Sequence, residues 1–585
     1  MTGPCNIASA LPRLAAEHPD RVAMRCPGRS GRYDDTLTYA QLDARSDAIA
    51  AGLARRGVVR GTRTVVMVRP TPEFFVLMFA LFKAGAVPVL VDPGIDRRAL
   101  RQCLDEAAPE AFIGIPLAQC ARVLLGGART ARVRITTGRE AQLSDATRAR
   151  GERDGAGAGP QLSDTQPDDV AAILFTSGST GVPKGVVYRH RHFIAQVEML
   201  RDAFGIEAGG IDLPTFPPFA LFDPALGLTS IIPDMDPTRP ADADPRRLHA
   251  AIARFGVDQL FGSPALMRVL AEHGQPLPTL RRVTSAGAPV PPEVVAKMLG
   301  LLPEGAGFWT PYGATECLPV AVIGGRELLE LRERTECGAG TCVGRPVAPN
   351  EVRIIRVSDD AIAEWSDALL VRPGEVGEIT VAGPTATDTY FNREAQTRLA
   401  KIRERVVAPA QPSPASGGGL KSTAGVEASA RDVQLPPPLA GEGRGGGARE
   451  RIVHRMGDLG WFDAEGRLWF CGRKSQRVET ADGPLYTEQI EPVFNTHPDV
   501  RRTALVGIGA RGAQTPVLCV EVRAGIARGE HARIETELRA IGARFAHTAR
   551  IDAFAFHPGF PVDIRHNAKI GREKLAQWAA TRSHA

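Results

Sequence analysis

The sequence predicts an α/β protein with a large N-terminal domain of parallel-sheet αβα layers, a small β-rich subdomain and a smaller, hinged α+β C-terminal domain. The length of 585 residues exceeds what one hydrophobic core holds and implies at least two domains. Helical and strand-like runs alternate in the N-terminal part, which is typical of a parallel sheet covered by helices on both faces. Toward the C-terminus the pattern changes to short β-rich runs and then to an α+β pattern.

The alternation starts near residue 35 and predicts the first elements of the large domain. Helices are expected at 42–56, 73–84 and 97–107, and strands at 64–68, 87–91 and 111–115. It resumes after residue 185, with further strands expected near 259–262, 282–285 and 307–309. Residues 351–383 carry short β-rich runs, which indicate a small barrel or subdomain.

The last part of the chain is predicted to form a separate unit. Residues 461–477 are expected to form a hairpin that turns at Glu465 and Gly466. An α+β pattern follows, with helices expected at 487–495, 532–545 and 572–580 and strands at 502–507 and 516–522. We therefore expect an N-terminal domain of residues 1–472 and a mobile C-terminal domain of residues 473–585, hinged near 473–477.

Residues 408–450 break the α/β pattern. The stretch is rich in Pro, Gly and Ala and has almost no apolar periodicity. Such a segment buries too little apolar surface to offset the entropy of ordering it. We predict a disordered insertion on the surface of the N-terminal domain.

The composition is ordinary for a globular protein and excludes several classes of partner. Apolar residues make up 43% of the chain and charged residues 23%, with a net charge of +5 and no basic stripe that would indicate nucleic acid. The nine cysteines form no CxxC pair or metal-ligand cluster, so reduced thiols in a cytoplasmic protein are expected. The N-terminus lacks the pattern of a signal peptide, and the longest apolar stretch, 74–82, is too short to span a bilayer.

A hydroxyl- and glycine-rich loop follows the apolar run 171–175, which is predicted to be a buried strand. Glycines let backbone N–H groups approach an anion, hydroxyls add donors without bulk, and Lys184 adds a mobile positive charge. The loop differs from the Walker pattern because Gly185 and a strand-like run follow the lysine. A Ser/Gly turn between two strands is the alternative, but hydroxyls at nearly every non-glycine position favour a phosphate site.

This loop resembles the signature of the adenylate-forming superfamily, which includes acyl-CoA and aryl-CoA synthetases, luciferases and nonribosomal adenylation domains. The match to that signature is nearly verbatim, TSGSTGVPKG. It implies that ATP is a cofactor and that a set of loop residues handles its β- and γ-phosphates. These residues are Thr176, Ser177, Gly178, Ser179, Thr180 and Lys184.

A second motif, Ser-Ala-Gly-Ala-Pro at 285–289, matches the family segment that packs against adenine. The resemblance assigns Gly287, Ala288 and Pro289 to nucleotide binding. Without the resemblance, the segment would be only a loop after a strand.

A third motif, Tyr-Gly-Ala-Thr-Glu, occupies residues 312–316. The resemblance implies that Tyr312 stacks on adenine beside Gly313, that Thr315 bonds the α-phosphate and that Glu316 holds Mg²⁺. A carboxylate suits this hard cation, which keeps several of its waters. As an isolated pentapeptide the motif would equally fit the start of a helix capped by Thr315.

Three further residues complete the resemblance near the C-terminal domain. Asp458 matches the acid that accepts both ribose hydroxyls, and Arg473 matches the arginine near the ribose and the α-phosphate. Lys569 matches the lysine of the family's Gly-Lys-Ile-Arg pattern, although Ala568 stands where glycine is usual. Taken alone, these residues would be a turn acid, a solvent-facing arginine and a surface lysine.

These matches imply that a carboxylate attacks the α-phosphorus of Mg·ATP to give an acyl adenylate and pyrophosphate. Lys569, Thr315 and Glu316 would carry the catalysis, chiefly by neutralising charge and aligning the attack. The expected partner is a small acyl substrate, and no protein nucleophile is needed. Cys317 has no base partner in the sequence pattern and is interpreted as structural.

Within the superfamily, the chain looks most like the branch of olefin biosynthesis that closes β-lactones. The segment 216–227 is apolar and lacks the aromatic-His pair of many acyl-CoA synthetases, and Gln476 stands where their hinge has an acid. The resemblance implies adenylation of a long-chain 2-alkyl-3-hydroxy acid, ring closure by its 3-hydroxyl, and association with other enzymes of the pathway. The alternatives are a long-chain acyl-CoA synthetase and a non-catalytic nucleotide- or acyl-binding protein.

Overall fold

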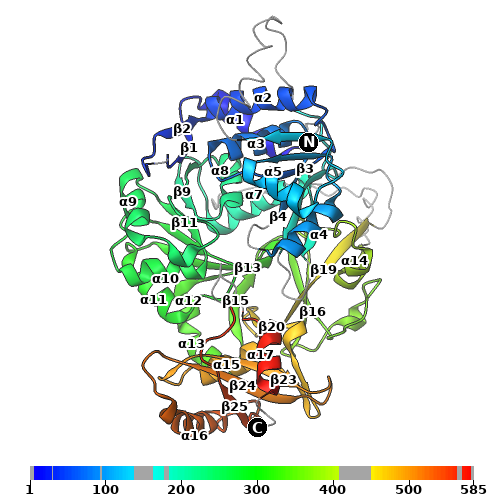
Figure 1. The fold of residues 1–585 in the computed structure, drawn as a ribbon. Helices are drawn as coiled ribbons and strands as arrows, with labels where there is room; N and C mark the ends of the chain where they lie inside the picture. The colour runs from blue at the N-terminus through cyan, green and yellow to red at the C-terminus, as the bar shows by residue number, and fades with distance from the viewer. Residues whose placement is uncertain are drawn as a thin grey trace, which may run out of the picture.

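The computed structural model describes residues 5–28, 30–91, 95–137, 162–176, 183–406, 449–562 and 570–581. Two large sheets and the helices around them form the greater part of the molecule, and a small three-stranded sheet lies near the C-terminus. In Figure 1 the C-terminal elements gather at the end of the molecule opposite α1 and α2. The predicted α/β class, with parallel layers and a small β-rich part, is confirmed.

A six-stranded sheet carries the start of the phosphate-loop motif. Its order is β6 (Val133–Thr136), β5 (Ala111–Gly114), β3 (Arg63–Met67), β4 (Val87–Val91), β7 (Val170–Thr176) and β8 (Lys184–Arg189). The strands pair in parallel except β8, which returns antiparallel to β7. Valine, isoleucine and phenylalanine fill these strands because both faces of a parallel sheet are covered.

The second sheet begins as a parallel layer. Its parallel strands, in order, are β1 (Val22–Cys26), β10 (Thr229–Ile231), β9 (Ile211–Pro214), β11 (Gln259–Gly262), β12 (Arg282–Ser285) and β13 (Gly307–Ala314). The strand β2 (Asp35–Thr38) closes one edge antiparallel to β1. The small β-rich part extends the other edge rather than forming a sheet of its own.

That extension is antiparallel and continues directly from β13. It consists of β14 (Cys317–Gly324), β15 (Thr341–Pro346), β20 (Leu468–Arg473), β19 (Arg449–Phe462), β17 (Gly377–Ala382) and β16 (Glu351–Ile355), with β18 (Lys401–Val406) paired to β19. The hairpin of β19 and β20 turns through residues 463–467, as predicted. The hairpin thereby places residues 454–473 next to the motif at 312–316.

The helix α3 (Pro72–Lys83) lies between the two large sheets. Its side chains are buried almost all round, and its core cluster joins residues of both sheets. Lys83 Nζ is buried but lies 2.5 Å from an Asp43 oxygen and 2.7 Å from an Asp47 oxygen of α2 (Tyr39–Arg55). A buried ammonium is tolerated because these carboxylates replace its water.

The helix α7 (His190–Phe204) also lies between the two large sheets, because it packs against β8 of one and β14 of the other. Further helices of the larger part pack around the sheets (Figure 1). They are α1 (Ala10–Glu17), α4 (Arg97–Ala107), α5 (Pro116–Leu125), α8 (Asp223–Leu226), α9 (Pro245–Phe255), α10 (Pro264–His273), α11 (Pro292–Leu301), α12 (Gly325–Glu330), α13 (Arg332–Glu336) and α14 (Glu394–Ala400). None of the helices in the described ranges is both long and apolar enough to cross a lipid bilayer.

The C-terminal part has its own sheet and cores. Its elements are β21 (Val478–Thr480), β22 (Gly483–Leu485), α15 (Thr487–Phe494), β23 (Val500–Ile508), β24 (Thr515–Val522), α16 (His531–Gly542), β25 (Ala553–Phe556) and α17 (Arg572–Ala580). Polar contacts join it to the larger part, among them Arg477 with Asp359 at 2.5 Å and Thr341 with Glu488 at 2.9 Å. The division at 472/473 and the motion of a lid stay predictions.

One sequence expectation needs correction. Residues 449 and 450 do not belong to an irregular insertion, because they begin β19 and pair with Val406 and Arg405 of β18. Ladder hydrogen bonds hold them extended although the neighbouring sequence is rich in glycine. The rest of the predicted insertion, 408–448, lies outside the described residues. The segment 312–316 ends β13 and turns into β14, so the alternative of a capped helix start does not apply.

Two buried carboxyl groups face each other where β9 meets α8. Asp223 is 3% exposed, accepts a hydrogen bond of 2.5 Å from Ser230 and shares another with Asp212. Burial raises the pKa of Asp223 from 3.8 to about 7 and raises the pKa of Asp212 as well, the charge of Asp223 adding to the latter shift. The folded protein therefore holds a proton here that the unfolded chain releases at lower pH.

We predict that replacing Asp223 with Asn flattens the pH dependence of stability. A pKa raised on folding gives stability that is complete below the unfolded value of 3.8 and is lost as pH rises through about 7. Wild type should lose free energy of unfolding across this window, on the order of a few kcal/mol, and Asp223→Asn should lose less. Urea unfolding at pH 4 to 8 measures this, with the exposed Asp552→Asn as control. Equal slopes in Asp223→Asn and wild type would contradict the shared proton.

Candidate active site

The phosphate-loop motif lies between two paired strands. Thr176 ends β7 and its backbone pairs with that of Lys184 at the start of β8. Ser177, Gly178, Ser179 and Thr180 lie outside the described residues. The Lys184 ammonium is 5.0 Å from the centre of the Tyr390 ring, on a segment that the sequence analysis did not assign to the site.

The adenine motif follows β12 at the carboxyl end of the parallel strands. Gly287 has a φ of 100°, a conformation open to glycine but strained for other residues, so the loop turns sharply here. Ala288, which is half-buried, and Pro289, which is exposed, follow it. Because β12 pairs in parallel with β13, this loop lies beside the strand that leads to Tyr312.

The motif at 312–316 forms the tight end of the hairpin between β13 and β14. Gly313 leaves no room for a side chain, since a Cβ there would lie 2.9 Å from the carbonyl oxygen of Cys317. The backbone carbonyl of Thr315 accepts a hydrogen bond from the Tyr188 hydroxyl. These contacts hold the turn, and with it Glu316, close to β8, the strand that begins at Lys184.

Tyr312 and Arg473, both half-buried, form one polar group with the buried Asp458. The Tyr312 hydroxyl donates to Asp458 Oδ2 at 2.7 Å, and an Arg473 nitrogen lies 2.9 Å from Asp458 Oδ1. Asp458 and Arg473 face each other across the hairpin of β19 and β20. Three residues assigned separately from the sequence are therefore brought together.

Burial and the neighbouring polar groups shift the pKa of Asp458 in opposite directions. Burial raises the pKa of Asp458, while Arg473 and the Tyr312 hydroxyl pull it back. The Asp458 carboxylate raises the pKa of Arg473, and burial together with Asp458 holds the pKa of Tyr312 well above its usual value. Tyr312 is thus a neutral hydrogen-bond donor, and Asp458 is a strong acceptor that hydroxyl groups of a ligand would find in place.

Glu316 is held by a segment outside the predicted motifs. The Tyr390 hydroxyl donates to Glu316 Oε1 at 2.7 Å, and Thr387 donates to the Glu316 carbonyl from both its amide and its hydroxyl. Glu316 Oε2 forms no hydrogen bond or ion pair with another described residue. One carboxylate oxygen remains available to a cation, which is what a magnesium ion with water and phosphate ligands needs.

Two buried basic residues also lie here and were missed by sequence reasoning. Lys401 begins β18 and pairs across the ladder with His454 of β19. Burial lowers the pKa of Lys401 to about 8, against the nearby Glu316 charge, which raises it. Burial and Lys401 lower the pKa of His454 well below its usual value, so this ring is neutral. Lys401 begins a strand of mixed polar sequence and belongs to no recognisable motif, so the sequence offered no signal for it.

The histidines after the phosphate loop are packing residues. His190 and His192 are buried at the start of α7, and burial lowers their pKa values to about 4 and about 3. Cys317 is buried against Thr385, and burial raises the pKa of its thiol to about 11. A thiol with so high a pKa is a poor nucleophile, in keeping with the structural role expected for it.

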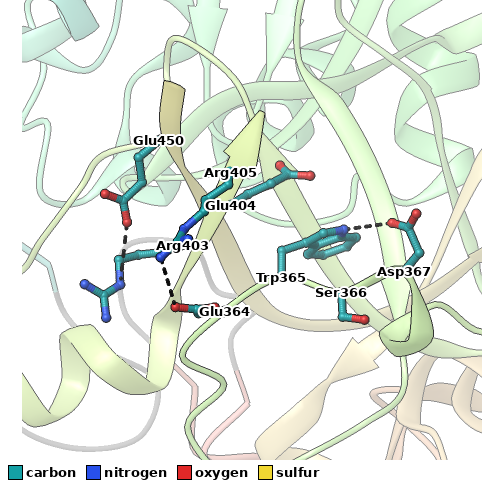
Figure 2. Close-up of a pocket in the computed structure, with 8 residues that line it drawn as sticks. All are labelled: Glu364, Trp365, Ser366, Asp367, Arg403, Glu404, Arg405 and Glu450. Atoms are coloured by element: carbon teal, nitrogen blue, oxygen red, sulfur yellow. Dashed lines mark hydrogen bonds and ion pairs between the residues drawn. The ribbon is translucent and has the colours of Figure 1, made fainter. Parts of the chain in front are cut away.

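A surface cavity of about 340 Å³ lies away from these residues, on the outer side of β18 (Figure 2). Charges of both signs line it and pair among themselves, as Arg403 with Glu450 at 3.6 Å and Arg405 with Glu364 at 3.9 Å. No residue predicted for nucleotide binding lines this cavity, so it is not the candidate site.

The geometry thus collects Lys184, Glu316, Tyr312, Asp458 and Arg473 around the start of β8, the end of β13 and the paired residues of β19 and β20. Lys569 lies outside the described residues, so its distance from this group stays untested. The combination of a lysine, an available carboxylate oxygen and a buried acid facing a tyrosine suits a phosphorylated nucleoside with a bound cation.

Comparison with known proteins identifies the family. A family model described as AMP-binding enzyme matches residues 11–391. The chain belongs to the AMP-binding enzyme family. The resemblance drawn from the signature loop is confirmed, and the chain is an adenylate-forming ligase.

Two curated relatives of this AMP-binding enzyme match along nearly their whole length. It is 67% identical over 585 residues to the olefin beta-lactone synthetase of Xanthomonas campestris pv. campestris, covering 99% of this chain and 98% of the relative. It is 64% identical over 586 residues to the olefin beta-lactone synthetase of Stenotrophomonas maltophilia, covering 99% of each. The family assignment therefore extends over the C-terminal part as well.

A solved structure shares the fold. The o-succinylbenzoate coenzyme A synthetase of Bacillus subtilis, in complex with ATP and magnesium ion, superposes with a TM-score of 0.69 at 20% sequence identity. The match covers 97% of this chain and 98% of the synthetase. It supports the fold of an adenylate-forming enzyme across both parts of the chain.

We predict that removing the Tyr312 hydroxyl destabilises the protein. In Tyr312→Phe the buried Asp458 Oδ2 loses its donor, and an unsatisfied buried acceptor costs roughly 1–3 kcal/mol. Urea unfolding at pH 7 measures the loss. Tyr486→Phe is the control, because Tyr486 is also partly buried but donates no hydroxyl hydrogen bond to a described residue. A loss of the same size in both variants would mean that the Asp458 contact contributes nothing specific.

Proposed function

We propose that this AMP-binding enzyme is a β-lactone synthetase of olefin biosynthesis. It adenylates a long-chain 2-alkyl-3-hydroxy acid with ATP and then closes a four-membered lactone, releasing AMP and pyrophosphate. The observation that carries the proposal is the 67% and 64% identity to two olefin beta-lactone synthetases over 99% of the chain.

The residues around the hairpin of β19 and β20 fit a nucleotide. Asp458, with Arg473 beside it, would accept the ribose hydroxyls, and Tyr312 would lie against adenine. Lys184 and the loop before it would neutralise the β- and γ-phosphates, and Thr315 would bond the α-phosphate. Lys569, from the C-terminal domain, would complete the set of positive charges.

The described residues also fit a magnesium ion. Glu316 offers one oxygen while Tyr390 fixes the other, and a carboxylate is a ligand that Mg²⁺ prefers. When bound, the ion supplies positive charge against the triphosphate. The work of the protein is to hold the acid and the phosphate in line, because both reactants are anions.

Ring closure needs no second substrate. The 3-hydroxyl group belongs to the acid that carries the adenylate, so it attacks the acyl carbonyl from within the same molecule and displaces AMP. Effective molarities of intramolecular nucleophiles reach the order of 10⁵ M or more, which offsets part of the ring strain. Gln476 and Glu479 stand where hinges of CoA ligases carry an acid and a lysine, in keeping with a reaction that uses no thiol.

The proposal also gives the enzyme a place among others. One class of enzyme must supply a 2-alkyl-3-hydroxy acid, and another must convert the lactone to an olefin. We propose that the enzyme associates with these partners of the same pathway.

We predict that the purified protein with ATP, Mg²⁺ and a 2-alkyl-3-hydroxy acid releases AMP and pyrophosphate without CoA. The product should show the carbonyl absorption of a β-lactone in the infrared and a mass one water below that of the acid. The same incubation with CoA should give the same product. If the acid is consumed only with CoA and a thioester appears, the protein is an acyl-CoA synthetase instead.

We predict that Lys569→Ala abolishes most adenylation. Loss of a positive charge that faces developing negative charge in the transition state lowers such rates roughly 10²–10³-fold. Exchange of labelled pyrophosphate into ATP measures the first half-reaction alone. Lys574→Ala, an exposed lysine of α17, is the matched control and should keep the wild-type rate. Equal rates in the two variants would remove Lys569 from the mechanism.

A further inference from the structure

A short segment, residues 385–391, connects the two halves of the candidate site. On one side it joins β8: the Phe391 amide donates to the Gly185 carbonyl at 2.8 Å, and Tyr390 forms a β-bridge with Val186. On the other side the Thr387 amide donates to the Glu316 carbonyl at 2.9 Å. This bridging segment therefore ties the strand of Lys184 to the hairpin that carries Glu316.

Tyr390 controls the carboxylate of Glu316. Its side chain is 5% exposed, and its hydroxyl donates to Glu316 Oε1 at 2.7 Å. A phenol hydroxyl donates and a carboxylate oxygen accepts, so this bond fixes Oε1 of Glu316. The ring in turn attracts two ammonium groups, Lys184 at 5.0 Å and Lys401 at 5.8 Å from its centre.

Lys401 holds the backbone of Glu316 in place through hydrogen bonds to Thr387. The buried ammonium donates to the Thr387 carbonyl and, at 3.2 Å, to the Thr387 hydroxyl. That hydroxyl donates onward to the Glu316 carbonyl at 3.0 Å. A hydroxyl that accepts from a cation is polarised and donates more strongly, so the chain of bonds fixes the hairpin turn.

We propose that Tyr390 and Lys401 are positioning residues that hold Glu316 ready for the metal of the nucleotide complex. The inference rests on the proposed function, in which Glu316 holds Mg²⁺. Tyr390 fixes one carboxylate oxygen and thereby turns the other toward the cation, and Lys401, through Thr387, fixes the backbone from which that carboxylate projects. Neither residue touches the substrate. Both restrict the motion of Glu316 in advance, so that less conformational entropy is lost when the ion binds.

The test measures how much a divalent ion strengthens ATP binding, without any turnover. Isothermal titration calorimetry with ATP, in the absence of acyl substrate, gives one dissociation constant with excess Mn²⁺ and one in EDTA. The ratio of the two reports the contribution of the metal. In Tyr390→Phe this ratio should fall roughly tenfold, while the affinity in EDTA stays near wild type, because only the donor to Glu316 is lost.

A matched control separates positioning from packing. Tyr39→Phe also removes a buried hydroxyl that donates, at 2.8 Å to the Leu228 carbonyl, but it lies in the core away from the nucleotide residues. Its ratio should equal that of wild type. Thr387→Val should lower the ratio, whereas Thr387→Ser, which keeps the hydroxyl, should retain it.

Glu316→Gln distinguishes the two levels of the argument. A lowered ratio in Glu316→Gln beside a wild-type ratio in Tyr390→Phe overturns the positioning role and leaves the proposed function standing. A wild-type ratio in both variants overturns the assignment of Glu316 to the metal and the positioning role with it. If the ratio also fell tenfold in Tyr39→Phe, the effect of Tyr390→Phe would be explained by a general loss of packing, and the proposal would be overturned.

Discussion

The structure depends on the cost of burying charge, which is met by partners that come from distant parts of the chain. Asp458 is buried, and its carboxylate persists there because Arg473 and the Tyr312 hydroxyl replace water at its two oxygens. Removing a buried charge's partner costs far more than the pair contributes, so such pairs fix the relative placement of the elements that carry them. Here they join the end of β13 to the hairpin of β19 and β20.

The same constraint operates through the rest of the molecule. Arg455 and Lys474 meet Glu378 at 2.6 and 3.0 Å inside the small β-rich part. Arg572 meets Glu491 at 2.5 Å where α17 packs against the C-terminal sheet. Glu378, Arg455 and Glu491 are buried against these counter-charges, and each pair marks a place where two elements must stay in register. The acid pair Asp212 and Asp223 is the exception, and it meets the cost by keeping a proton instead.

At the candidate site this constraint has a chemical consequence. An enzyme that brings a carboxylate acid to a triphosphate must gather positive charge and hard oxygen ligands before either substrate arrives. Lys184, Lys401 and Arg473 supply the former among the described residues, and Glu316 supplies an oxygen that Tyr390 leaves available. The bridging segment 385–391 bonds both to β8 and to the hairpin that carries Glu316, so the charged groups are held apart from one another. Preorganisation of this kind, rather than a protein nucleophile, suits acyl transfer through an adenylate.

Local features of the sequence were enough for much of the fold. The apolar run 87–91 and the amphipathic run 97–107 became β4 and α4 with the expected bounds, because periodicity and helix caps act within a few residues. One expectation failed where ladder bonds overrode local composition, because residues 449 and 450 pair with β18. The motif at 312–316 lies in a hairpin because β14 returns beside β13. Pairing energy from a distant strand is invisible in the local pattern.

By itself the sequence determined the family, the α/β class and the identity of Glu316, Asp458 and Arg473 as candidates, because each lies in a contiguous motif whose residue types bind phosphate, ribose or a hard cation. Only the tertiary structure decided which side chains hold those candidates in place. Tyr390 meets Glu316 from 74 residues away, and Tyr312 meets Asp458 from 146 residues away. Such contacts arise from strand order in a shared sheet, where residues remote along the chain become neighbours, and no spacing along the sequence encodes them.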